Sequence, residues 1–123
     1  MTDAMQRTSS SKNEVATWEG NEAGIDLTAA GGSVRIEPPG DFRLLRLACH
    51  FDAGVAPTVT IDQDNHAGAL WDQNIRTVVL PAGSDYYTFV GGQGYEYPLG
   101  DAIVISFTAV AAIVYVSWVM EQI

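Results

Sequence analysis

The sequence has 123 residues, of which 47% are hydrophobic, and its six basic and fifteen acidic side chains give a formal net charge of −9. This length and composition predict one domain with a buried core and exclude wholesale disorder. The acidic balance repels phosphate backbones, so nucleic acid is excluded as an expected partner.

The first 23 residues are polar, lack periodicity and carry one large aromatic side chain, Trp18. They contain no apolar core of the kind that a signal peptide needs, so we expect cytosolic synthesis. A segment this polar cannot offset its own ordering cost. We therefore predict an extended N-terminal arm over residues 1–23, anchored by Trp18 on a partner rather than on its own domain, and a single β-sandwich domain over residues 24–123.

Runs with strand character follow the arm, and turn signals separate them. The turns PPGD (residues 38–41), PAGS (81–84) and PLGD (98–101) contain proline, which presets a turn, and glycine, which adopts an unusual backbone angle. In two of them an aspartate can cap the amides of the turn. Strands at this spacing, without helical periodicity, predict an all-β fold: an antiparallel β-sandwich or jelly roll. The expected strands are residues 33–37, 42–51, 58–62, 74–80, 86–90, 102–108 and 113–120.

Residues 42–51 form the longest predicted strand, in which a core-facing set alternates with a mixed face that carries Arg46 and His50. Two adjacent leucines, Leu44 and Leu45, break the alternation and predict a β-bulge or burial of both. Cys49, the only cysteine, belongs to the core-facing set. It allows no internal disulfide, and its place predicts a small buried hydrophobe rather than a nucleophile.

The polar segment TIDQDNHAGALWDQ (residues 60–73) resembles a metal site at first sight, because Asp62, Asp64 and His66 have the one-three-five spacing of a calcium loop. The sixth position should be glycine and is Ala67, and the twelfth should be glutamate and is Gln73. The pattern therefore favours a polar loop between strands over a calcium site.

Catalytic signatures are otherwise missing. A two-carboxylate hydrolase using Asp62, Asp64 or Asp72 is an alternative, but nothing in the sequence pairs these carboxylates across a cleft. Two histidines are too few for a metal cluster, and no phosphate loop, dinucleotide fingerprint or GxSxG occurs. We therefore predict a protein that is not an enzyme and that binds no metal or cofactor.

The segment VGGQGYEYP (residues 90–98) is rich in aromatic side chains. Exposed rings of Tyr95 and Tyr97 could stack on a sugar, which makes them the candidate contacts for a glycan. The more ordinary interpretation is that aromatic residues this close to strands belong to the core or to an interface.

No charged residue occurs from Ala102 to Met120, a length that would suffice for a membrane-spanning helix. Its β-branched composition, its acidic flanks and the small residues at its centre favour a β-hairpin instead, so we expect no membrane partner. The last strand is apolar on both faces and needs cover on both sides, either from a neighbouring subunit or from a loop across its back. The residues predicted to face a partner are Val114, Val116 and Trp118.

The segments DQDNHAGALWDQNIRTVVLPAG and YEYPLGDAIVISF together resemble a broad group of small structural virion proteins of tailed bacteriophages. In that group a strand ends in a polar loop of the AGAxxD kind, matched here by residues 67–69 with Asp72. A Pro/Gly-Asp turn then leads into a GDAIxVxF-type strand, matched by residues 100–103. The resemblance extends over residues 42–120, although the last turn reads TAVAA where the group has an Asn/Asp-Gly type.

The resemblance implies a β-sandwich that builds or decorates a particle, with no catalytic residues to transfer. We therefore expect a capsid decoration or cement protein on the exterior of the virion, which binds and stabilises the shell of major capsid protein. We also expect a homo-oligomer, a trimer rather than a dimer. The alternative is a carbohydrate- or receptor-binding module on a tail or fibre.

Overall fold

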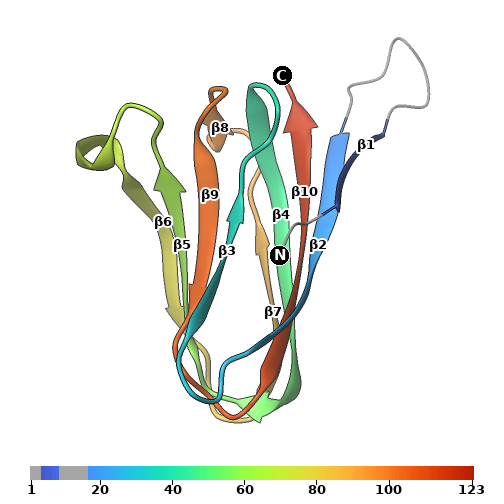
Figure 1. The fold of residues 1–123 in the computed structure, drawn as a ribbon, viewed down its shortest axis with the longest axis vertical. Helices are drawn as coiled ribbons and strands as arrows, with labels where there is room; N and C mark the ends of the chain where they lie inside the picture. The colour runs from blue at the N-terminus through green and yellow to red at the C-terminus, as the bar shows by residue number, and fades with distance from the viewer. Residues whose placement is uncertain (1–3, 9–16) are drawn as a thin grey trace.

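The computed structural model describes residues 4–8 and 17–123, which form two antiparallel β-sheets packed face to face (Figure 1). The larger sheet has the strand order β1-β2-β10-β4-β7, with β8 beside β4, and the smaller sheet has the order β3-β9-β5-β6. The predicted all-β, antiparallel sandwich is confirmed. Its elements are β1 (Ala4–Thr8), β2 (Thr17–Asp26), β3 (Gly32–Ile36), β4 (Phe42–Val55), β5 (Thr58–Asp64), η1 (Ala69–Trp71), β6 (Gln73–Val79), β7 (Ser84–Val90), β8 (Glu96–Tyr97), β9 (Ala102–Phe107) and β10 (Ile113–Gln122).

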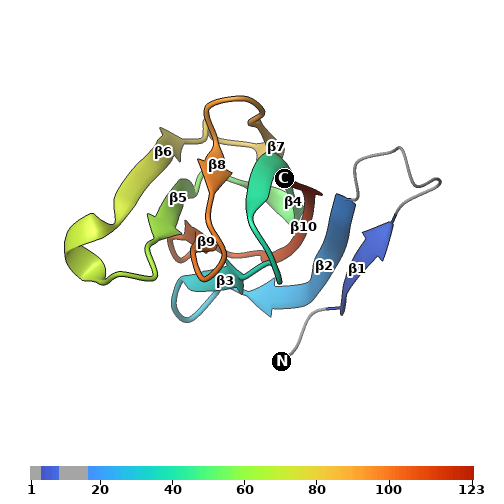
Figure 2. The ribbon, with the colours of Figure 1, turned by 90° about the horizontal axis from the view of Figure 1, so that it is seen from above.

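Most connections cross from one sheet to the other, so the loops gather at two ends of the sandwich (Figure 1). The β3–β4, β5–β6 and β7–β9 connections lie at the end where the chain terminates. Seen from above, the two sheets curve around a common interior (Figure 2). Alternate side chains of each strand point into this interior and form one core.

Strands β9 and β10 confirm that the uncharged run is two strands, but the predicted hairpin is wrong. Strand β9 pairs with β3 and β5, whereas β10 pairs with β2 and β4. The connection over residues 108–112 crosses between sheets. This crossing lets the two most apolar strands lie in opposite sheets, where each supplies cover for the inner face of the other sheet.

The arm predicted over residues 1–23 extends too far. Strand β2 begins at Thr17 and pairs with β10 from Asp26 to Thr17, so residues 17–23 belong to the larger sheet. Trp18 is only 4% exposed and packs in the core of its own domain, where its ring lies 3.3 Å from the position that a Cβ on Gly40 would take. The prediction that Trp18 anchors the arm on a partner is therefore wrong, because Trp18 is a core residue of its own domain. Residues 4–8 form β1 against β2, and the rest of the predicted arm, residues 1–3 and 9–16, lies outside the described residues.

The bulge predicted at the paired leucines is confirmed. In the pairing of β10 with β4, Val119 lies opposite Arg46 and Met120 opposite Leu44, so Leu45 has no partner of its own. Leu44 is fully buried and Leu45 is half-buried. The extra residue therefore sets which side chains of β4 face outward.

The burial of Trp18 yields a test with a matched control. We predict that Trp18→Ala lowers the free energy of unfolding by about 3–5 kcal/mol, because the cavity replaces a large ring in the core. Trp71, which is exposed, provides the control, and Trp71→Ala should change that free energy by less than about 0.5 kcal/mol. Urea unfolding followed by circular dichroism measures both. Equal stability of the two variants would show that Trp18 is not a core residue.

Candidate partner-binding loop

The β5–β6 loop exposes two large apolar side chains on its helical turn η1. The side chain of Leu70 is 97% exposed and that of Trp71 is 63% exposed. Figure 1 shows η1 projecting at the outer side of the sandwich, beyond the ends of β5 and β6. We call Leu70 and Trp71 the apolar tip.

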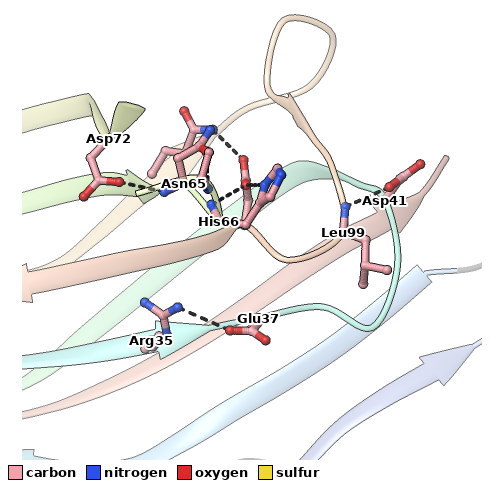
Figure 3. Close-up of polar contacts among 10 residues, drawn as sticks. Arg35, Glu37, Asp41, Asn65, His66, Asp72 and Leu99 are labelled. Carbon is pink, nitrogen blue, oxygen red and sulfur yellow. Dashed lines mark hydrogen bonds and ion pairs between the residues drawn. The ribbon is translucent and has the colours of Figure 1, made fainter. Parts of the chain in front are cut away.

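Hydrogen bonds within the loop fix the backbone beneath the apolar tip. The N–H of Asn65 donates to Asp72 Oδ1 (2.7 Å), and the N–H of Ala67 donates to Asn65 Oδ1 (2.8 Å). The N–H groups of Gly68 and Trp71 donate to the carbonyls of Asn65 (3.1 Å) and Gly68 (3.0 Å). Gly68 has a φ of 127°, which a side chain would strain. The loop is thus preorganised by its own polar groups (Figure 3), and its two largest apolar side chains stay exposed.

A buried carboxylate joins this loop to the rest of the sandwich. Asp101, fully buried at the start of β9, accepts hydrogen bonds from the main chain of His66 (3.0 Å) and from Gln63 Nε2 (2.6 Å). The ring Nδ1 of His66 lies 2.6 Å from the same carboxylate. Burial acts to raise the pKa of Asp101, but these hydrogen bonds outweigh it, and the pKa lies below its ordinary value of 3.8.

Of the two Pro/Gly-Asp turns, PLGD has the predicted glycine conformation, whereas Gly40 of PPGD has no positive φ, and the caps differ from the prediction in both. The N–H of Asp101 donates to the carbonyl of Pro98 (3.2 Å), and Gly100 has a φ of 98°. The carboxylate of Asp41 accepts from the N–H of Leu99 (2.8 Å), which belongs to the other turn (Figure 3). The aspartates thus cap the amides of neighbouring loops rather than those of their own turns, which ties this end of the sandwich together.

Each acidic side chain near the loop has its own hydrogen-bond or ion-pair partner. Asp62 accepts a hydrogen bond from Asn74 Nδ2 (2.9 Å), Asp64 forms an ion pair with Arg35, and Asp72 caps the loop. In the part of the chain that the structure describes, no three His, Cys, Asp or Glu side chains are grouped to hold a metal ion. The arrangement supports a structural role for these carboxylates.

The residues predicted to bind a partner through β10 lie on the wrong face for that role. Val114, Val116 and Trp118 are at most 1% exposed and pack in the core. The prediction failed because β10 is apolar on both faces, so periodicity could not say which face points inward. The outer face carries Tyr115, which is 47% exposed.

Tyr95 and Tyr97 are half-buried and do not offer free rings to a sugar. The ring of Tyr95 meets Phe89 edge-on at 5.3 Å between centroids, and Tyr97 lies 5.4 Å from Phe42. Burial raises the pKa of Tyr97 to about 12. Both rings pack against the core, which is the more ordinary of the two interpretations drawn from the sequence.

The apolar tip was missed at the sequence level, although a signal for it is present. Leu70 and Trp71 are the two large apolar residues in an otherwise polar loop, and polar neighbours cannot bury them locally. Sequence alone left open whether they return to the core.

Comparisons with known proteins add little. No family model and no curated protein matches this sequence. Among solved structures, the chain is similar to one described as the crystal structure of PirA, with a TM-score of 0.40 and 9% identity over 80% of this chain and 95% of that chain. A similarity of this level carries no argument about function. Within the described residues, no helix has the length and apolar character needed to cross a membrane.

Asp101 gives a pH-dependent prediction. Asp101→Asn should lower the free energy of unfolding at neutral pH by on the order of 2 kcal/mol, because an amide cannot replace a carboxylate that accepts this set of hydrogen bonds. Folding lowers the pKa of Asp101, so the stability that its carboxylate contributes is complete above the unfolded value of 3.8. It is lost as the pH falls through the lower folded value.

Urea unfolding of both proteins, from neutral pH to about pH 2, measures this difference. The exposed Asp85 on β7 provides the control, since Asp85→Asn should leave stability nearly unchanged at every pH. A gap between wild type and Asp101→Asn that stays constant down to the lowest pH would contradict the assignment.

Cys49 gives a second chemical test. Its side chain is buried, and burial raises the pKa of the thiol to about 12. The thiol donates to the carbonyl of Tyr87 (3.4 Å). Because the thiolate is the reactive form, we predict no reaction of the folded protein with a thiol-specific reagent at pH 8 and complete reaction in urea. Rapid labelling without denaturant would show that Cys49 is accessible.

Proposed function

We propose that this protein is a non-catalytic virion structural protein that decorates the capsid of a tailed phage, with the apolar tip docked on the major capsid protein. The observation that carries the proposal is the β5–β6 loop, which holds Leu70 and Trp71 outside the domain on a hydrogen-bonded backbone. Such preorganisation lowers the entropy lost on binding. Tryptophan is also enriched among the residues that dominate interface energies.

The strand order supports the same proposal at the level of the fold. The orders β2-β10-β4-β7 and β3-β9-β5-β6 are those of a jelly roll, with β1 and β8 as additions at the edges. Jelly rolls occur in viral capsid proteins and in lectins. Because a fold hosts several functions, this order agrees with the proposal and with its alternative, and the choice depends on the sites.

The charges around the apolar tip define the partner surface further. Asp72 directly follows Trp71 in the sequence and lines one depression together with Asp62 and Asp64, in a protein with a net charge of −9. A matching site on the capsid would therefore be an apolar pocket with a basic rim. The acidic balance also suits a position on the exterior of the virion, away from packaged DNA.

The alternative function is a carbohydrate- or receptor-binding module on a tail or fibre. Tyr95 and Tyr97, on which it rested, pack against the core. A different pair of rings, Tyr86 and Tyr115, is exposed on the outer face of the larger sheet.

Binding to undecorated particles tests the proposed function. Trp71→Ala should weaken binding by about 30-fold, as expected for loss of a contact worth about 2 kcal/mol. Cosedimentation with purified capsids measures it, and particle melting temperature reports on stabilisation of the shell. Tyr86→Ala removes an exposed ring from another face and serves as the control, with unchanged binding expected. No binding by the wild type, with no change in particle heat stability, would refute the capsid assignment.

A further inference from the structure

The outer face of the larger sheet contains a depression of about 350 Å³ that runs across β2, β10, β4 and β7. Most of its lining side chains point away from the core, and Tyr86, Tyr115 and His50 are among the exposed ones. We call this depression the outer groove.

The register of the strands explains why a hollow forms there. Tyr115 on β10 lies opposite His50 on β4, and His50 lies opposite Tyr86 on β7, so three large side chains form one row across the sheet. Two residues further along, the next row on this face contains Ser117, Ala48 and Thr88. The small row forms the floor and the ring row forms a wall.

The following row on the same face does not line the outer groove. There Val119 lies opposite Arg46, and Arg46 lies opposite Val90. The outer groove is thus bounded by the ring row on one side along the strand direction and remains open across the strands. With neighbouring strands about 4.8 Å apart, it crosses the four strands over roughly 15 Å, which suits an extended chain rather than a compact ligand.

The lining combines exposed ring surface with many hydrogen-bonding groups. Tyr86 is 69% exposed and Tyr115 is 47% exposed. Beside them lie the side-chain hydroxyls of Ser117 and Thr88 and the amide of Asn21. A purely apolar partner would leave these polar groups unpaired at a cost. A sugar ring has a face of C–H groups, which packs on an aromatic ring, and a rim of hydroxyls, which pairs with hydroxyl and amide groups.

The negative charge of the protein limits which sugars the outer groove can bind. The protein carries a net charge of −9, so sialic acids and other acidic sugars would be repelled. We propose that the outer groove binds a chain of neutral sugars, with sugar rings stacked on Tyr86 and Tyr115 and hydroxyls hydrogen-bonded to Asn21, Thr88 and Ser117.

This site is separate from the apolar tip. The tip lies on the β5–β6 loop of the smaller sheet, whereas the outer groove lies on the face of the larger sheet that points away from the smaller one; Figure 2 shows η1 far from β2 and β10. A capsid-bound protein could therefore present the outer groove to solvent, and failure of one site says nothing about the other.

Titration with defined oligosaccharides tests the inference. The probes are maltohexaose, cellohexaose and chitohexaose, which are neutral and differ in linkage or substitution, and a glycan array extends the search to other neutral chains. Amide chemical shifts in ¹⁵N-labelled protein measure binding. At least one neutral chain should shift the amides of Ala48, Thr88 and Ser117. Tyr86→Ala and Tyr115→Ala should each weaken that binding by tenfold or more.

Trp71→Ala is the matched control, since it removes an exposed ring outside the outer groove and should bind the same sugar unchanged. The inference is overturned if no neutral chain binds at millimolar concentration, or if the tyrosine variants bind as well as the wild type. It is also overturned if the amide shifts depend on protein concentration alone, which would identify the occupant as a second copy of this chain.

Discussion

The fold depends on covering the inner face of β10. Val114, Val116 and Trp118 on this strand are buried, and β10 lies between β2 and β4 in the larger sheet. A strand that is uncharged as far as Met120 needs, in this position, paired neighbours on both edges and a second sheet across its inner face. Strand β2 pairs with one of these edges although its own sequence is polar, and Trp18 and the partly buried Ile25 are its contributions to the core. Strand β2 has the weakest strand pattern in the sequence, and its pairing with β10, which has the strongest pattern, holds it in the sheet.

The sequence predicted the parts of the fold that follow from local pattern. Alternation and turn signals located seven strands to within a few residues, and the leucine pair located the bulge in β4. The local pattern could not predict which strands pair with each other. Whether the chain after β9 forms a hairpin with β10 or crosses to the other sheet depends on contacts with strands that are distant in sequence. The same limit applies to β2, whose glycines and charges give no periodicity, and to the choice of face on β10, where both faces are apolar.

The two candidate sites differ in how much of each could be predicted from the sequence. Nearly all polar residues of the β5–β6 loop form hydrogen bonds that stabilise the loop, so the resemblance to a calcium site came from groups with structural roles. The exposed pair Leu70 and Trp71 could have been noticed as the residues left without a structural role. The outer groove could not, because it is assembled from β2, β10, β4 and β7, and the sequence distances between them carry no information about register.

The size of the apolar tip has a consequence for how the protein would bind a shell. A stable interface buries about 800 Å² on each partner, and a tryptophan side chain supplies about 150–250 Å² of this. A single tip therefore falls short unless neighbouring loops contribute or several tips act together. A homo-oligomer, with the trimer we expect as one case, would present several tips to a shell of repeated subunits. The second contact then forms at a high effective concentration, and the affinity of the assembly exceeds that of any one tip. Weak individual contacts of this kind also let misplaced copies dissociate before the remaining tips engage, so multivalent docking favours correct placement as well as retention.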